Sequence, residues 1–196
     1  MIIRACLFAV MASPALADCP TSADLATGIK ATLSDGTIEE YRAFRPGLVE
    51  IISRLEDGVT TRTLLGQGIY VIELADLENG QIVPDTRITA SYPMNADAMP
   101  LPEPDGKWSV AVGMRDAGGF FQEKQSHRWG ELTQATYQGC TYTMLPGQLV
   151  YTGDGYRYDE EIHYLPELGI SLLISFSEDG AVPDKYSYNA FEIMGK

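Results

Sequence analysis

The stretch that decides the fold runs from Tyr137 to Ser177 and reads YQGCTYTMLPGQLVYTGDGYRYDEEIHYLPELGISLLISFS. Near its C-terminal end, Ile170, Leu172, Ile174 and Phe176 alternate with Ser171, Leu173, Ser175 and Ser177. A two-residue period turns one of these sets toward a core and the other outward. The stretch also contains Cys140 and four tyrosines between residues 151 and 164. Together these features predict a β-meander that ends in a half-buried antiparallel strand.

Turn signals recur at short intervals in the first half of the chain. They are Asp35-Gly36, Pro46-Gly47, Asp57-Gly58, the pair Gly66 and Gly68, and Asn79-Gly80. Between them lie four segments of strand length, residues 38–45, 48–55, 59–65 and 68–74. Such segments joined by tight turns predict a four-stranded up-and-down meander. Further strands are expected at residues 86–92, 107–114, 120–125, 127–132 and 185–193.

Two other segments break this pattern. Residues 92–106 contain four prolines, which lack amide donors, so an extended surface loop is expected there. Residues 21–36, TSADLATGIKATLSDG, carry Leu25, Ile29 and Leu33 at four-residue spacing after a Thr21 or Ser22 cap. This spacing predicts a short amphipathic helix that packs on the sheet. The predicted class is therefore mostly β (α+β), an antiparallel meander with one N-terminal helix.

The first 17 residues have the pattern of a secretory signal peptide. Arg4 precedes an apolar run, and the small residues Ala15 and Ala17 frame a cut before Asp18. The run is too short, and too interrupted by Pro14, to span a hydrocarbon layer of about 30 Å, so no membrane span is expected. Because Asp18 precedes Cys19, a lipoprotein signal is not expected either. These features predict a periplasmic protein, cleaved after Ala17, with a single β-rich domain over residues 18–196.

Cleavage removes one of the three cysteines, Cys6, and leaves Cys19 and Cys140. Exported proteins enter compartments that permit oxidation, so this pair predicts one disulfide. The bridge would tie the mature N-terminus to the stretch at residues 137–177.

The formal charge of the chain is −13, and losing Arg4 with the leader makes it −14. Such a surface repels phosphate backbones, so nucleic acid is not expected as a partner.

The common motifs of catalytic sites are absent from the sequence, including HExxH, GxSxG, CxxC, the phosphate loop and the EF-hand. The best polar constellation is Asp159, Glu161 and His163, with Glu160 beside them. On a strand, Glu161 and His163 project from one face about 7 Å apart, and a carboxylate beside an imidazole could raise the imidazole pKa for acid/base chemistry. With His127 the same histidine could form part of a metal site. The alternative is a solvated strand edge, and neither a metal nor another cofactor is expected.

A further segment, YLPELG at residues 164–169, resembles the half-barrel proteins of the Gram-negative periplasm, the lipoprotein-carrier type. The resemblance rests on the expected topology, an exported chain with one amphipathic helix and a long antiparallel meander, and on Tyr164, Pro166, Glu167, Leu168 and Gly169. It implies a curved sheet, or half-barrel, with a helix closing its concave face and a hydrophobic cavity. The disulfide and the proline-rich loop do not map onto the carriers.

These observations favour an exported, non-enzymatic binding or interaction protein that holds an apolar or lipid-like small molecule in a curved sheet. One alternative is a periplasmic hydrolase that uses Glu161 and His163. Another is a structural envelope protein that binds a second envelope protein through a sheet edge and takes no small molecule.

Overall fold

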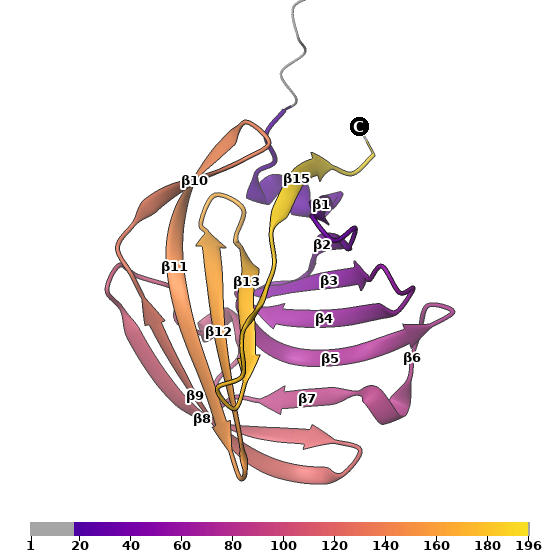
Figure 1. Ribbon diagram of the computed structural model, residues 1–196, viewed down its shortest axis with the longest axis vertical. Helices are drawn as coiled ribbons and strands as arrows, with labels where there is room; N and C mark the ends of the chain where they lie inside the picture. Colours follow the sequence, from indigo (N-terminus) through magenta and orange to yellow (C-terminus); the bar gives the residue numbers. More distant parts are fainter. Residues whose placement is uncertain (1–17, 196) are drawn as a thin grey trace, which may run out of the picture.

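An antiparallel sheet of fifteen strands makes up most of the computed structural model, which describes residues 18–195 (Figure 1). The predicted signal peptide, residues 1–17, lies outside the described residues. The strands are β1 Ile29–Leu33, β2 Ile38–Arg45, β3 Leu48–Arg54, β4 Thr60–Gly66, β5 Tyr70–Glu78, β6 Gln81–Ile82, β7 Ile88–Ser91, β8 Lys107–Asp116, β9 Gly119–Trp129, β10 Thr133–Tyr137, β11 Cys140–Gly153, β12 Tyr156–Leu165, β13 Ile170–Glu178, β14 Asp184–Lys185 and β15 Tyr188–Ile193. Three short 3-10 helices, η1 Ser22–Ala26, η2 Pro84–Thr86 and η3 Ala96–Ala98, accompany them. The predicted antiparallel β class is confirmed.

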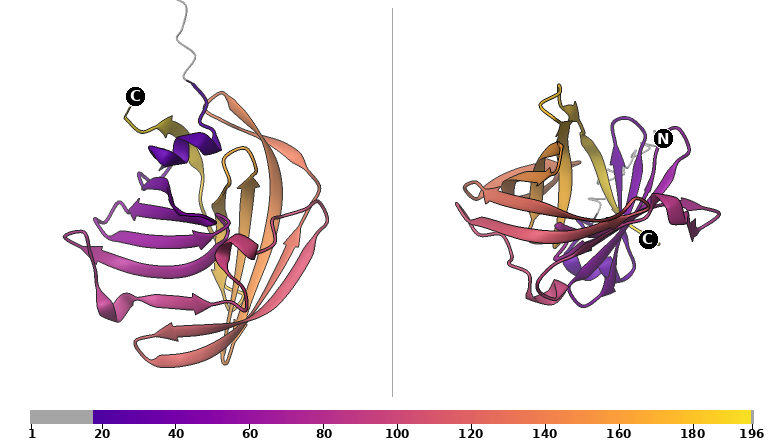
Figure 2. Two further views of the ribbon diagram at one scale, coloured as in Figure 1. Left: turned by 180° about the vertical axis from the view of Figure 1, so that it is seen from behind. Right: turned by 90° about the horizontal axis from the view of Figure 1, so that it is seen from below.

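The order of strands in the sheet is β14-β13-β12-β11-β9-β8-β7-β5-β4-β3-β2-β1-β15, while β10 adds to β11 and β6 to β5. The sheet is open, with β14 and β15 at its two edges. These edge strands are consecutive in the chain, so residues 184–193 pair first with β13 and then with β1. Figures 1 and 2 show β8–β13 as one curved layer and β2–β7 as a second layer whose strands run at a steep angle to it.

The predicted meander of residues 38–74 is present as β2 to β5, with each strand paired to the next. The two strands expected at residues 120–125 and 127–132 are instead one strand, β9. The proline-rich segment connects β7 to β8. Some of it is anchored, since Met99 is buried and the Tyr70 hydroxyl donates a hydrogen bond to the carbonyl of Pro100.

The prediction of an N-terminal helix is wrong. The structure has only the 3-10 turn η1, followed at once by β1. Gly28 between them has φ of 116°, a backbone conformation that ends a right-handed helix. In β1, Ile29, Ala31 and Leu33 are all buried. A helix that closes a concave face, as the carrier resemblance implied, is therefore absent from residues 18–195.

The main core lies where β1–β3 and β15 pack against β11–β13. Tyr41, Ile170 and Leu172 are almost fully buried in it. A second core, around Tyr70 and Trp129, fills the inner side of β9, β11 and β12. At roughly 25 cal/mol for each Å² of apolar surface removed from water, this burial is the main term that holds the two layers together.

The predicted disulfide is present, since Cys19 is bonded to Cys140 at the start of β11. The two Cα atoms are 5.6 Å apart and the residues are 121 positions apart in the chain. The bridge fixes the segment before η1 onto the main core. It also indicates an oxidising compartment.

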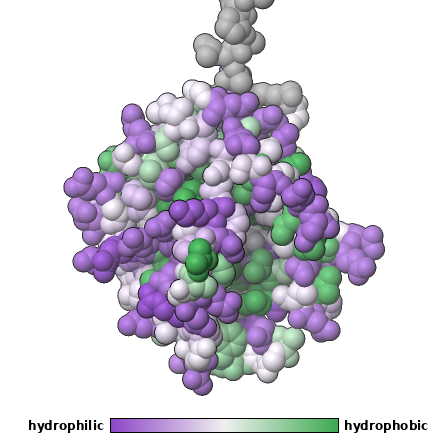
Figure 3. All heavy atoms as spheres, viewed as in Figure 1, coloured by the Kyte–Doolittle hydropathy of each residue, from purple (hydrophilic) through white to green (hydrophobic). Residues whose placement is uncertain are grey.

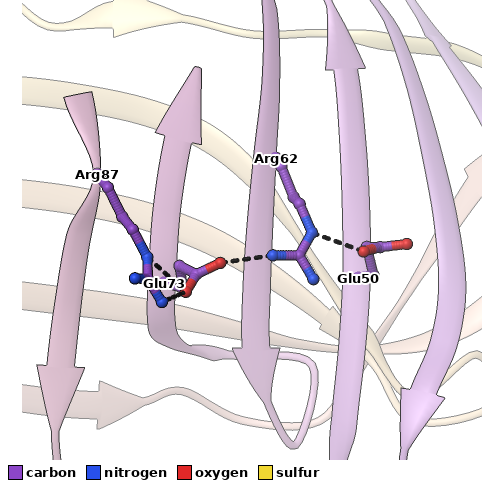
Figure 4. A network of polar contacts seen from close by, with 4 residues as sticks. All are labelled: Glu50, Arg62, Glu73 and Arg87. Carbon is purple, nitrogen blue, oxygen red and sulfur yellow. Dashed lines mark hydrogen bonds and ion pairs between the residues drawn. The ribbon is translucent and has the colours of Figure 1, made fainter. Parts of the chain in front are cut away.

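A row of alternating charges crosses the exposed side of β3–β7 (Figure 4). Arg62 donates to Glu50 at 2.7 Å and also to Glu73, and Arg87 donates through Nε to Glu73 at 3.0 Å. Glu73 is only 7% exposed, and its two arginine partners offset the cost of burying its charge. We interpret this row as a structural element of the sheet.

No helix within residues 18–195 is both long enough and apolar enough to cross a membrane.

Candidate functional site

The three residues predicted as a polar cluster, Asp159, Glu161 and His163, lie on β12 at alternating positions and so share one face of it. Each has a different partner. Asp159 binds the Arg157 guanidinium through both oxygens at 2.7 and 2.6 Å. Glu161 accepts a hydrogen bond from the Ser175 hydroxyl at 3.1 Å. His163 Nδ1 lies 3.0 Å from the hydroxyl of Tyr137.

The hypothesis of an activated histidine expects Glu161 to raise the pKa of His163. The net shift in the structure has the opposite direction. The pKa of His163 is lowered by burial, and Glu161 opposes this effect without reversing it. The hydrogen bond from Arg157 lowers the pKa of Asp159. Within residues 18–195, no hydrogen bond joins Glu161 to His163, so the pair is not assembled as an acid/base dyad.

The second histidine, His127, lies on the opposite face of the sheet. It pairs across β9 and β11 with Leu149, which pairs in turn with Glu160 and not with Glu161. His127 is 3% exposed among the rings of Tyr70 and Trp108, and neither ring nitrogen has a hydrogen-bond partner among residues 18–195. The two histidines therefore cannot share a metal. No group of three or more histidine, cysteine or acidic residues in the described part of the chain is placed to hold one.

Asp159 and Glu161 belong instead to a polar groove on the exposed side of β8–β13, which we call the outer groove. Its central row crosses six strands in register and consists of Lys107, Arg128, Gln148, Glu161, Ser175 and Lys185. The hollow has a volume of about 690 Å³. An adjoining hollow of about 390 Å³ shares Arg128, Gln148 and Glu161 with it and reaches His163.

Several side chains in the outer groove have no polar partner in the part of the chain that the structure describes. No hydrogen bond or ion pair within residues 18–195 engages the side chain of Lys107, Arg128, Gln148 or Lys185. Groups of this kind are available for hydrogen bonds to a bound molecule. The row also explains why the groove was only partly predicted. Asp159 and Glu161 are close in sequence and form a visible cluster, whereas the other residues of the groove lie on β8, β9 and β11, far from them in the chain.

A second polar group, missed from the sequence, lies on the inner side of β9, β11 and β12. We call it the inner polar cluster, and it comprises Tyr92, Glu123, Gln125, Tyr151, Tyr156 and Glu160. A chain of hydrogen bonds runs from Tyr92 to Gln125 at 2.7 Å and from Gln125 to Glu123 at 2.8 Å. Tyr156 also donates to Glu123, at 2.8 Å. Glu123 and Gln125 are buried, although a strand pattern assigns polar residues to the outside. Their neighbours Gln122, Lys124 and Ser126 are polar as well, so no hydrophobic alternation marks the inner face of this segment.

Within this cluster, Glu160 is a carboxyl group whose pKa lies well above its ordinary value. Burial raises its pKa to about 7, and nearby Glu123 adds to the effect. The Tyr151 hydroxyl donates a hydrogen bond to Glu160 at 2.9 Å, and this bond lowers the pKa of Glu160 and so opposes the effect of burial. A carboxyl that titrates near neutrality in a cluster of tyrosines can bind or release a proton.

The fold and the two polar groups define a disulfide-linked antiparallel β protein with a polar surface groove. No protein-family model matches the sequence, and no curated protein matches it. Among solved structures, the chain is similar to the hypothetical lipoprotein YmcC from Escherichia coli (K12), at 11% sequence identity and a TM-score of 0.47. The similarity covers 88% of this chain and 91% of that chain. It carries no argument about function, and it gives no support to the resemblance to the carrier type.

Proposed function

We propose that the protein is an exported, periplasmic binding protein that works without catalysing a reaction, and that the outer groove is its binding surface. The observation that carries this proposal is the set of hydrogen-bonding side chains in the groove that have no partner in the described part of the chain. A volume of about 690 Å³ falls within the range of small-molecule sites, roughly 300 to 1,000 Å³. The predicted leader and the disulfide support export to an oxidising compartment.

The groove supports a polar ligand better than an apolar one. Most of its central row is charged or hydrogen-bonding, whereas the inner side of the sheet is occupied by packed side chains of the two cores. Figure 3 shows that hydrophilic residues cover much of the face of the molecule seen in Figure 1, with hydrophobic residues visible in a hollow near its centre. The expectation of a lipid-like ligand on the concave face stays a prediction, as does the hydrolase that would use Glu161 and His163.

The test compares two tryptophan variants on the same face of β11. Gln148→Trp fills the floor of the outer groove, while Thr152→Trp, four residues along the strand, places the same ring outside the central row. Both positions are exposed, so neither change should disturb the core. We expect native mass spectrometry of protein purified gently from the periplasm to find a bound small molecule on the wild type and on Thr152→Trp, and to find it lost from Gln148→Trp.

Other outcomes would contradict the proposal. A lipid-like molecule retained by Gln148→Trp would place the site on the concave face. A wild-type protein with no bound molecule under any growth condition would favour the structural envelope protein. Hydrolysis of a substrate that is lost in Glu161→Gln and His163→Ala would favour the enzyme.

A further inference from the structure

The exposed face of the β8–β9 hairpin gathers cations in a chain that is acidic overall. Lys107, Arg115, Lys124 and Arg128 all project from this face, as the register between the two strands shows. None of them forms an ion pair within residues 18–195, whereas Arg62, Arg87 and Arg157 do. In a chain with a formal charge of −13, a group of cations without ion pairs on one face creates a local positive potential that attracts anions.

Two of these cations stand directly opposite each other. Lys107 on β8 pairs in register with Arg128 on β9, which brings their Cβ atoms to about 5 Å. Like charges in directly opposed positions destabilise a sheet. An anion bound between the two side chains would remove this repulsion and supply charge-assisted hydrogen bonds.

Neutral donors surround the cationic pair. The next pair on the same face is Ser109 and Ser126, about 7 Å along the strands. The Ser109 hydroxyl donates to the Ser126 hydroxyl at 3.0 Å, which leaves the Ser126 proton free to donate to a ligand. On the other side of Arg128, the side-chain amide of Gln148, which has no partner among the described residues, adds two more donors.

We propose that Lys107, Arg128 and Ser126 form an oxyanion site at the basic end of the outer groove, and that it binds a soluble small molecule bearing a phosphate or carboxylate group. This inference rests on the proposed function and names the chemistry of the ligand. A soluble ligand is favoured over an anionic membrane surface because the net charge of the protein repels such surfaces. The size of the groove also suits a small molecule better than a bilayer.

The test is calorimetric titration of the mature protein with citrate and with glycerol 3-phosphate at an ionic strength of about 0.1 M, where the Debye length is about 10 Å. Arg128→Gln removes a cation from the site, and Arg115→Gln removes an equally unpaired cation from the same face of the same hairpin. We expect at least one probe to bind the wild type, with affinity about tenfold lower in Arg128→Gln. Arg115→Gln should stay within about twofold of the wild type, because beyond the Debye length a charge contributes little.

Thermal melting gives a second readout that does not depend on the choice of probe. Without added anion, Arg128→Gln should melt about 1 to 2 °C above the wild type, since the opposed charges are gone. Added citrate is expected to raise the melting temperature of the wild type, and it should raise that of the variant by less, because the affinity of the variant is about tenfold lower.

The proposal fails if neither probe binds, if Arg115→Gln weakens binding as much as Arg128→Gln, or if vesicles of anionic phospholipid bind while the soluble probes do not. It also fails if the ligand found on the native protein is neutral and stays bound in Arg128→Gln. In that last case the proposed function stands and only the oxyanion site is lost.

Discussion

Glu160 shows how the alternation of side chains along a strand sets the pKa of a single residue. Its neighbours Asp159 and Glu161 project to the exposed side of β12, whereas Glu160 projects inward beside Tyr151 and Glu123. Burial raises the pKa of Glu160 to about 7, above the ordinary value of an exposed carboxyl. The folded protein therefore binds this proton more tightly than the unfolded chain does.

The sign of the effect on stability follows. A group with a raised pKa in the folded state favours folding while it is protonated, so its contribution to the free energy of unfolding falls as the pH rises from about 4.5 to about 7. Above that range the protein carries the full cost of the buried charge. His127 acts in the opposite direction, because burial lowers its pKa to about 4, and Glu39, with a raised pKa, acts in the same direction as Glu160.

We therefore expect a pH-dependent difference between Glu160→Gln and the wild type. At pH 5 the variant should be more stable by less than about 1 kcal/mol, and at pH 8 it should be more stable by roughly 3 kcal/mol. Glutamine keeps an acceptor for the Tyr151 hydroxyl, so the local packing is retained. Urea denaturation at the two pH values measures the difference.

Glu161→Gln, one residue along β12, is the matched control. It removes a carboxylate of the same kind from the exposed face and should shift stability by less than about 0.5 kcal/mol. If Glu160→Gln differed from the wild type by the same amount at pH 5 and pH 8, the pKa of Glu160 in the folded protein would be ordinary and the argument would be wrong.

At the scale of single elements, the N-terminal segment shows the limit of a periodic pattern. Leu25, Ile29 and Leu33 are spaced by four, which fits a helix. Four is also a multiple of two, so Ile29 and Leu33 share a face in a strand as well. Gly28 decides between the two, because its positive φ interrupts the helix after η1. The sequence contains the glycine and the threonines, which disfavour a helix. It does not show that β15 offers an edge with which β1 pairs.

The disulfide joins this segment to β11, and its contribution to the free energy of unfolding can be measured. The bridge spans 121 residues, and a loop of that length restricts the unfolded chain by roughly 4 to 5 kcal/mol in the entropy model. The double variant Cys19→Ser/Cys140→Ser should therefore melt about 10 °C or more below the wild type. Thermal denaturation followed by circular dichroism measures the shift.

Reduced wild-type protein provides the control, since it should melt like the double variant. Thiol titration of the oxidised mature protein should find no free thiol. A double variant that melts within about 2 °C of the wild type would show that the strands around Cys140 hold the N-terminus without the bridge.

At the scale of the whole molecule, the sequence predicted the strands better than it predicted their neighbours. Tight turns between β2, β3, β4 and β5 predicted their pairing because each connection is too short for another arrangement. The pairing of β9 with β11 and of β1 with β15 spans long stretches of chain, and no local pattern encodes it. The outer groove depends on the first of these long-range pairings, so Glu161 could be proposed as a site residue while Arg128 could not.

The segment that joins the two edges of the sheet is the region whose removal we expect to lower the stability of the protein most. After β14, the Tyr186 amide donates to the carbonyl of Ile174 on β13, and the Ser34 amide donates to Ser187 just before β15. The buried rings of Tyr188 and Phe191 then enter the main core beside β1. The C-terminal residues thus connect the two layers by backbone hydrogen bonds and by packing.

A chain truncated after Lys185 should not form a stable domain. Losing two buried aromatic residues costs roughly 3 to 5 kcal/mol each, which approaches the total stability of a typical domain, roughly 5 to 15 kcal/mol. The truncation also exposes the edge of β1, which favours aggregation. Val182→Ser, at a position between β13 and β14 that is 92% exposed, is the control and should melt within about 1 to 2 °C of the wild type. Size-exclusion chromatography and thermal melting report both effects, and a monomeric truncated protein that melts cooperatively near the wild-type temperature would show that the two layers hold together without β15.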